Sequence, residues 1–269
     1  MSYLEPTEFV TKMVDAGESK AYMSTKDTLI RAFMAGAILA LAAVFAITVA
    51  VKTGSPVLGA ILFPVGFIML YLMKFDLLTG VFTLVPLALL DKRPGVTFGQ
   101  VMRNWGLVFI GNLAGALSVA FMMSFILTYG YNTDGGVIAE KVGSIGESRT
   151  LGYKEHGISG WITIFIRGML CNWMVSMGVV GAMISTSATG KMAAMWMPIM
   201  LFFFMGFEHS IVNMFLFPFS MIMGGDFTVV DYVIWNELPT VLGNLVGGFV
   251  FVGLPLYYTH VRTSAERKL

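Results

Sequence analysis

The chain has 269 residues, of which 57% are apolar and only 12% are charged, and its formal net charge is +1. Soluble globular domains carry roughly a quarter of charged residues, so this composition predicts a membrane protein. The near-zero net charge argues against a nucleic-acid-binding surface, which needs a basic excess. The single cysteine, Cys171, excludes an internal disulfide and a multi-cysteine metal site, and we expect it to pack as a buried thiol.

The N-terminal segment is charged and has no long apolar run, so we expect no signal peptide. Phe9, Val10, Met13 and Val14 recur at helical spacing. This pattern predicts an amphipathic helix within residues 1–28 that lies on the cytoplasmic face of a membrane.

Six crossings follow from the apolar runs, because a spanning helix needs roughly 20 apolar residues. The first, third, fourth and sixth crossings are expected within residues 32–51, 104–133, 157–190 and 238–259. The second, within 53–90, is split by Lys74, Phe75 and Asp76, and the fifth, within 192–225, is split by Glu208 and His209. The longest connection, roughly 132–156, is expected to be a loop on the outer face.

An even number of crossings puts both termini on the same face of the membrane. The segments on that face carry more lysine and arginine than those on the opposite face, which predicts cytoplasmic termini in a plasma (inner) membrane protein. The residues on the terminal face are Lys12, Lys20, Lys26, Arg31, Lys92, Arg93, Arg103, Lys191, Arg262, Arg267 and Lys268, and those on the opposite face are Lys52, Lys141, Arg149 and Lys154.

An internal repeat relates the two halves of the chain. The pattern N-x6-G-N-L-x-G begins at Asn104 and recurs 132 residues later at Asn236, and Gly36 and Gly168 have the same separation. Three crossings per half is an odd number, so the halves must have opposite orientations. We therefore predict a six-span channel domain, 29–259, built from inverted repeats at roughly 29–133 and 158–259, followed by a cytoplasmic tail, 260–269. Inverted repeats with a broken helix in each half indicate a central permeation site.

The interruption at Glu208 and His209 lies deep in an apolar segment, with at least fourteen uncharged residues on each side. An ionisable residue at that depth costs several kcal/mol unless it is partnered, so its default interpretation is functional. The alternative for His209 is a core histidine satisfied by its neighbours. Glu208 could contact the permeating solute or accept hydrogen bonds from backbone N–H groups exposed by the break.

Several segments resemble the formate–nitrite transporter family. The stretch 206–214 is similar to the family signature, 76–80 to its first-half loop, 168–173 to its fourth-span motif, and Asn104-Trp105 with Gly111-Asn112 to its third. The resemblance implies an all-α, aquaporin-like fold with helices 2 and 5 broken. It also implies a homopentamer with one pore per protomer, no cofactor, and transport of formate, nitrite, hydrosulfide, acetate or lactate, often with a proton.

The resemblance also assigns a pathway for the anion. The central pair falls on His209 and Thr79, with Asn172 nearby, and Glu208 beside them. Two apolar constrictions are implied, an outer one at Phe63 and Phe202 and an inner one at Phe67 and Leu77. Each of these aromatic residues could instead be an ordinary core or lipid-facing side chain.

Many members of the family place a lysine sixteen residues before the fourth-span asparagine, at the outer vestibule. His156 occupies that position in this chain, and Lys154 lies two residues earlier. Either residue could attract anions to the mouth of the pore, although His156 would do so only when it is protonated.

We therefore predict a channel or transporter for small monovalent anions of weak acids, with a proton as second substrate and His209 as the proton partner. The alternative for His209 is hydrogen bonding to the anion without proton transfer. Two alternatives belong to other classes. An aquaporin-like pore for neutral solutes should carry Asn-Pro-Ala at both breaks, and the chain has no such tripeptide. A multispan membrane enzyme would need a nucleophile or a metal cluster, but the three histidines lie in separate regions and Ser210 has no apparent triad.

Overall fold

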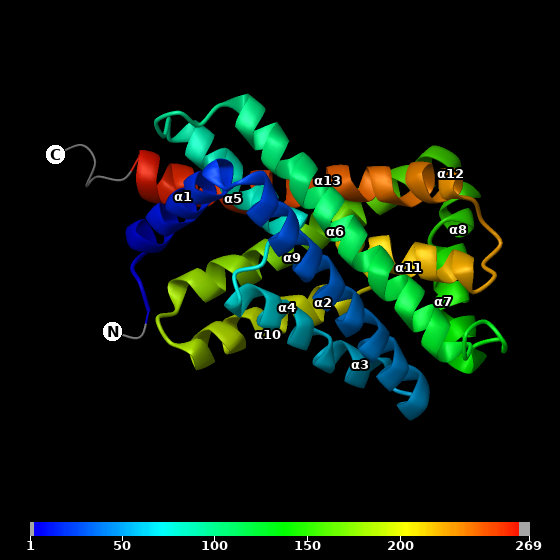
Figure 1. Cartoon of the computed structure of the whole chain (residues 1–269). Helices are drawn as coiled ribbons and strands as arrows, with labels where there is room; N and C mark the ends of the chain where they lie inside the picture. Colours follow the sequence, from blue (N-terminus) through cyan, green and yellow to red (C-terminus); the bar gives the residue numbers. More distant parts are fainter. Residues whose placement is uncertain (1–2, 264–269) are drawn as a thin grey trace.

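The computed structural model describes residues 3–263, which form helices and, in that range, no strand beyond one isolated bridge between Tyr3 and Ser185 (Figure 1). The prediction of an all-α protein is confirmed. The predicted tail falls largely on residues 264–269, which lie outside the described range. The α-helices are α1 (Pro6–Tyr22), α2 (Thr25–Thr53), α3 (Pro56–Leu62), α4 (Pro64–Leu72), α5 (Leu78–Leu90), α6 (Phe98–Leu127), α7 (Gly136–Ser148), α8 (Leu151–Lys154), α9 (Gly157–Ile184), α10 (Ala188–Phe204), α11 (Ser210–Ile222), α12 (Val229–Tyr232), α13 (Leu238–Gly248) and α14 (Leu254–Tyr257).

Within residues 3–263, four helical stretches are long and apolar enough to cross a membrane: α2, α6, α9 and the continuous stretch Val229–Arg262. The last joins α12, α13 and α14 through the π-helical segments η1 (Val233–Glu237), η2 (Phe249–Gly253) and η3 (Tyr258–Arg262). It begins nine residues before the predicted sixth crossing, because Thr228 caps it with a reciprocal capping box to Asp231.

Two pairs of shorter apolar helices lie at the predicted interruptions. The helix α4 ends at Leu72 and α5 begins at Leu78, while α10 ends at Phe204 and α11 begins at Ser210. The expected loop at 132–156 is wrong, since it contains the helices α7 and α8. The helix α7 buries Ala139, Val142 and Gly146 on one face, and packing against α11 stabilises it.

Glycine lets two pairs of helices approach closely, α2 with α6 and α9 with α13. A Cβ atom on Gly115 would lie 2.0 Å from the Phe33 carbonyl oxygen, and one on Gly247 would lie 2.0 Å from the Met169 carbonyl oxygen. Real Cβ atoms do not approach a carbonyl oxygen that closely. Both glycines belong to the repeated N-x6-G-N-L-x-G pattern, so the pattern marks the same kind of helix contact in each half.

Buried asparagines hold the two helix breaks in the same way. The Asn112 side chain accepts a hydrogen bond from the Leu78 backbone N–H (2.9 Å) and donates to the Asp76 carbonyl oxygen (2.9 Å). The Asn244 side chain makes the same two contacts with Ser210 and Glu208, at 3.0 and 2.9 Å. These backbone groups have no helical partner at a break, and each asparagine satisfies one donor and one acceptor.

The N-terminal helix α1 packs its apolar face against α5 and α9 rather than leaving it for lipid. Its buried residues include Phe9, Val10, Met13 and Val14, as the periodicity predicts. The end of α1 is fixed by an ion pair between Lys20 and Asp76. The start of the chain is thereby attached to the first helix break.

We predict that Gly115→Ala lowers the apparent melting temperature of the purified protein in detergent, because the added methyl group forces α2 and α6 apart. Overpacking of this kind costs about 1–3 kcal/mol. Gly106→Ala, on the same helix but with nothing within 4 Å of the added Cβ, is the matched control and should leave the melting temperature unchanged or raise it. Equal melting temperatures for the two variants would contradict the close contact.

Candidate functional site

The two helix breaks meet at one polar contact. Thr79 follows the start of α5, His209 immediately precedes α11, and the Thr79 Oγ1 and His209 Nε2 atoms lie 3.3 Å apart. Both residues are almost completely buried. The predicted central pair is therefore brought together by segments 130 residues apart in the chain.

His209 caps the N-terminus of α11. Its Nδ1 atom accepts a hydrogen bond from the Val212 backbone N–H at 3.3 Å. An accepting Nδ1 carries no proton, so this bond assigns the ring proton to Nε2. The Nε2–H group points at Thr79 and can donate a hydrogen bond to its hydroxyl or to an acceptor that replaces it.

Asn172 supports the first break from α9. Its side-chain N–H groups donate to the backbone oxygens of Thr79 (3.1 Å) and Asn244 (2.6 Å), and its oxygen accepts from the Ser176 hydroxyl (3.3 Å). Asn172 lines neither of the two cavities described below. It therefore joins the Thr79 backbone to α13.

Three phenylalanines cluster beside the histidine. The Phe202 ring stacks on the His209 ring with centroids 5.5 Å apart and meets the Phe63 ring edge-on at 5.6 Å. Phe203, which the sequence analysis did not single out, stacks on Phe63 at 3.9 Å. Phe63 and Phe202 are fully buried, so the predicted pair forms one continuous apolar contact next to His209.

A cavity of about 490 Å³ reaches this cluster; we call it the His209 cavity. His209, Phe202 and Val212 form part of its wall, and residues of α2 and α3 form another part. Its cations are Lys141 on α7 and Arg149 just after it. Neither was predicted as a site residue, because both lie in the segment that was expected to be a loop.

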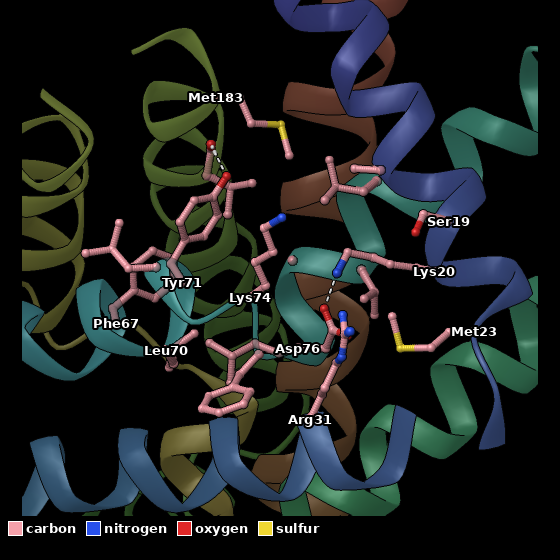
Figure 2. A pocket seen from close by; sticks show the side chains of 18 of the residues that line it. Ser19, Lys20, Met23, Arg31, Phe67, Leu70, Tyr71, Lys74, Asp76 and Met183 are labelled. Atoms are coloured by element: carbon pink, nitrogen blue, oxygen red, sulfur yellow. Dashed lines mark hydrogen bonds and ion pairs between the residues drawn. The ribbon is translucent and has the colours of Figure 1, made fainter. Parts of the chain in front are cut away.

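A second cavity, of about 360 Å³, lies at the first break; we call it the Lys74 cavity (Figure 2). Phe67 and Leu77, predicted as one constriction, line it together with Tyr71. Its charged lining residues are Lys20, Arg31, Lys74, Asp76 and Lys191. The two cavities have no lining residue in common.

Neither predicted vestibule cation lines the His209 cavity. The Lys154 Nζ atom lies 2.8 Å from Asp231 Oδ1, so its charge is used to join α8 to α12. His156 is exposed at the start of α9. Lys154 ends α8 and His156 immediately precedes α9, whereas the cations that line the cavity, Lys141 and Arg149, lie on α7 and just after it.

Glu208 is held in a buried side-chain network and does not line the His209 cavity. Its carboxylate accepts from Asn213 (3.0 Å), Asn236 (3.3 Å) and Tyr153 (3.4 Å) and lies 3.6 Å from Arg149 Nη1. The partners are side chains rather than the backbone N–H groups expected at the break. Burial raises the pKa of the Tyr153 phenol, which keeps it protonated as a donor to this carboxylate.

A second buried carboxyl group, Glu237, was not foreseen. It accepts hydrogen bonds from the Ser210 hydroxyl and from the Tyr232 hydroxyl (2.8 Å). The sequence signal was present, because Glu237 directly precedes an apolar run, but a crossing that begins at residue 238 left it outside the membrane. Within residues 3–263, no three histidine, cysteine or acidic side chains are grouped to hold a metal ion.

Comparison with known proteins identifies the family. Residues 7–258 match the formate/nitrite transporter family. The chain is 31% identical to an uncharacterized transporter, YrhG, of Bacillus subtilis (100% of this chain, 98% of the relative) and 31% identical to a probable formate transporter of Methanothermobacter thermautotrophicus (97% and 98%). It is 30% identical to the formate channel FocA of Escherichia coli K12, over 97% and 96% of the two chains.

Solved structures give the same result. A pentameric formate channel with formate bound superposes with a TM-score of 0.72 at 25% identity, covering 88% of this chain and 98% of that one. A family ion channel superposes with a TM-score of 0.81 at 24% identity, covering 94% and 98%, and supports the fold. With its long apolar helices and paired helix breaks, this chain is a membrane protein that belongs to the formate/nitrite transporter family, a family of channels and transporters rather than enzymes.

Proposed function

We propose that this protein is a channel for small monovalent anions of weak acids, with formate as the first candidate. The observation that carries the proposal is the Thr79–His209 contact, buried between two cavities that share no lining residue. Formate is supported as the substrate by two similar proteins, the formate channel FocA and a pentameric formate channel with formate bound. Nitrite and hydrosulfide belong to the same proposed class because they are compact and carry one negative charge.

The proposed architecture is six crossings in two inverted three-helix repeats with an aquaporin-like arrangement. The proposed segments are an N-terminal helix within 1–28, a channel domain at 29–259 and a tail at 260–269. The matched contacts of Asn112 and Asn244 at the two breaks support the repeat. The excess of lysine and arginine supports cytoplasmic termini. In this orientation the Lys74 cavity faces the cytoplasm and the His209 cavity faces the outside.

An anion from the outside would first meet Lys141 and Arg149, which replace Lys154 and His156 in the proposed vestibule. It would then pass Phe63 and Phe202 to reach His209. A bare charge between apolar rings is costly, and such rings also exclude water by dewetting. The hydrogen-bond donors of His209 and Thr79 therefore act where the anion has lost its hydration, before it passes Phe67 and Leu77.

Proton linkage through His209 is part of the proposal. Donation of a hydrogen bond from Nε2–H needs no change in the resting geometry. Transfer of a proton requires the imidazolium form, in which Nδ1 also carries a proton and can no longer accept from the Val212 N–H. An anion beside the ring stabilises the imidazolium, so we propose that the ring takes up a proton from the outer solution as the anion enters, and that this opens the capping bond. The ring becomes neutral again when one of its two protons passes to the anion. The neutral acid then passes the inner constriction at Phe67 and Leu77 at a lower free-energy cost than the anion.

We predict that formate uptake into proteoliposomes rises as pH falls in the wild type. His209→Asn keeps a hydrogen-bond donor without a titratable group, so it should transport formate with no pH dependence. His209→Phe keeps the ring but removes both nitrogens, and should reduce proton-coupled uptake to the level of protein-free vesicles. Stopped-flow swelling over a pH series measures all three. Unchanged pH dependence in the Asn variant would exclude His209 as the proton partner.

The proposed vestibule makes a separate prediction. Lys141→Gln removes a cation that lines the His209 cavity, and we expect it to raise the half-saturating formate concentration by roughly two- to fivefold at low ionic strength. Lys154→Gln is the control, since that lysine is paired with Asp231 outside the cavity. If Lys154→Gln raised the half-saturating formate concentration more than Lys141→Gln does, Lys154 would be the vestibule cation instead.

We also propose a homopentamer in the lipid bilayer, supported by the pentameric relative and by the large apolar side chains that α6 leaves exposed, such as Phe121, Met122 and Phe125. Native mass spectrometry of the protein in detergent should give a mass of five chains. A monomer that still conducts formate after reconstitution would refute the assembly.

A further inference from the structure

Lys74 has a backbone conformation that favours glycine. Its φ angle is +58°, in the left-handed region. It lies just after α4, where its N–H donates to the Tyr71 carbonyl oxygen and the Phe75 N–H donates to the Leu70 carbonyl oxygen, both at 2.9 Å. These two bonds end the helix in a Schellman-type turn, and a residue with a Cβ atom is strained in this position.

The second break has glycine at the equivalent position. Gly206 lies 132 residues after Lys74, its φ angle is +64°, and the corresponding bonds to the Phe203 and Phe202 carbonyl oxygens are both 3.1 Å. The same turn is therefore made in both halves, and glycine makes it without strain. The first half instead has a lysine, whose backbone is no better suited to the turn than that of any other residue with a side chain.

The Lys74 side chain projects into the Lys74 cavity, between Tyr71 and Lys20 (Figure 2). Lys20 is already paired with Asp76, the one carboxylate among the lining residues. Lys74, Arg31 and Lys191 form no ion pair with any carboxylate in the described part of the chain. Three uncompensated cations thus line one concave space beside the inner pair Phe67 and Leu77.

We propose that Lys74, with Arg31 and Lys191, forms an anion-binding subsite in this cavity for the small carboxylate that permeates. The inference rests on the proposed function and adds a second binding station to it. An anion held beside Lys74 lies next to the inner constriction at Phe67 and Leu77. The subsite raises the local anion concentration on this side, as we propose for Lys141 in the other cavity.

Lys92 shows that the backbone conformation by itself is not a site. It also has a positive φ angle, +55°, and ends α5 with equivalent bonds to the Leu89 and Ala88 carbonyl oxygens. Its side chain is exposed, as that of Lys74 is, but it does not line the cavity. The two lysines share backbone strain and charge and differ in what the ammonium group faces, so Lys92→Gly is a matched control for Lys74→Gly.

The test measures initial formate flux against formate concentration in proteoliposomes that contain the full chain. At low ionic strength, Lys74→Gly should raise the half-saturating concentration by about threefold to tenfold with little change in maximal flux. Salt near 1 M should largely abolish the difference, because it shortens the Debye length to about 3 Å. Lys92→Gly should match the wild type, and Lys74→Arg should restore low half-saturation.

Misfolding can be distinguished from lost anion binding, because Lys74→Gly relieves backbone strain and the variant protein should have a melting temperature at or above that of the wild type. Lys74→Asn, which tolerates the left-handed conformation, serves as a second neutral variant. Line broadening of ¹³C-formate by the purified protein reports binding without transport, and it should weaken in both neutral variants. Identical saturation curves and identical broadening for Lys74→Gly and Lys92→Gly would overturn the subsite. A wild type that broadens formate through Lys74 but transports none would instead refute the channel.

Discussion

The structure depends on satisfying backbone hydrogen-bonding groups where two helices break inside an apolar protein. A break frees N–H and C=O groups that neither lipid nor apolar side chains can pair, and each unpaired group would cost free energy comparable to a lost hydrogen bond. Asn112 and Asn244 satisfy these groups at the two breaks, and Asn172 fixes the Thr79 backbone from a third helix. With the breaks held in this way, the starts of α5 and α11 come within hydrogen-bonding distance of each other.

The need to pair backbone groups at the helix breaks also determines which atoms of the central histidine are free to react. His209 is the capping residue of α11, so its Nδ1 atom belongs to the scaffold while its Nε2 atom faces Thr79. One ring therefore both caps a helix terminus and contacts the residue that follows the other helix break. Phe202 stacks on the ring and fixes its plane. This arrangement couples any change in the charge of the ring to the first turn of α11.

Charge is distributed around this centre by elements that are remote in sequence. On one side α7 provides Lys141 and, just beyond its end, Arg149, which also balances the buried Glu208. On the other side α1 brings Lys20 to Asp76, and the first break presents Lys74. The helix α1 is thus part of a cavity wall, a role that its amphipathic pattern alone does not distinguish from binding to a membrane surface.

The sequence by itself determined the membrane class, the positions of both breaks and the repeated N-x6-G-N-L-x-G pattern, because long apolar runs, interrupting charges and a recurring motif are local signals. The pairing of Thr79 with His209 was implied only by the resemblance to a known family. Only the tertiary structure decided which cations face the cavities, that Glu208 and Glu237 are held by hydroxyl and amide groups, and that Lys154 is paired with Asp231. These facts depend on which side chain meets which partner across separate helices. A surface lysine, a paired lysine and a cavity lysine look the same in sequence, and only the packing of α7, α8 and α1 distinguishes them.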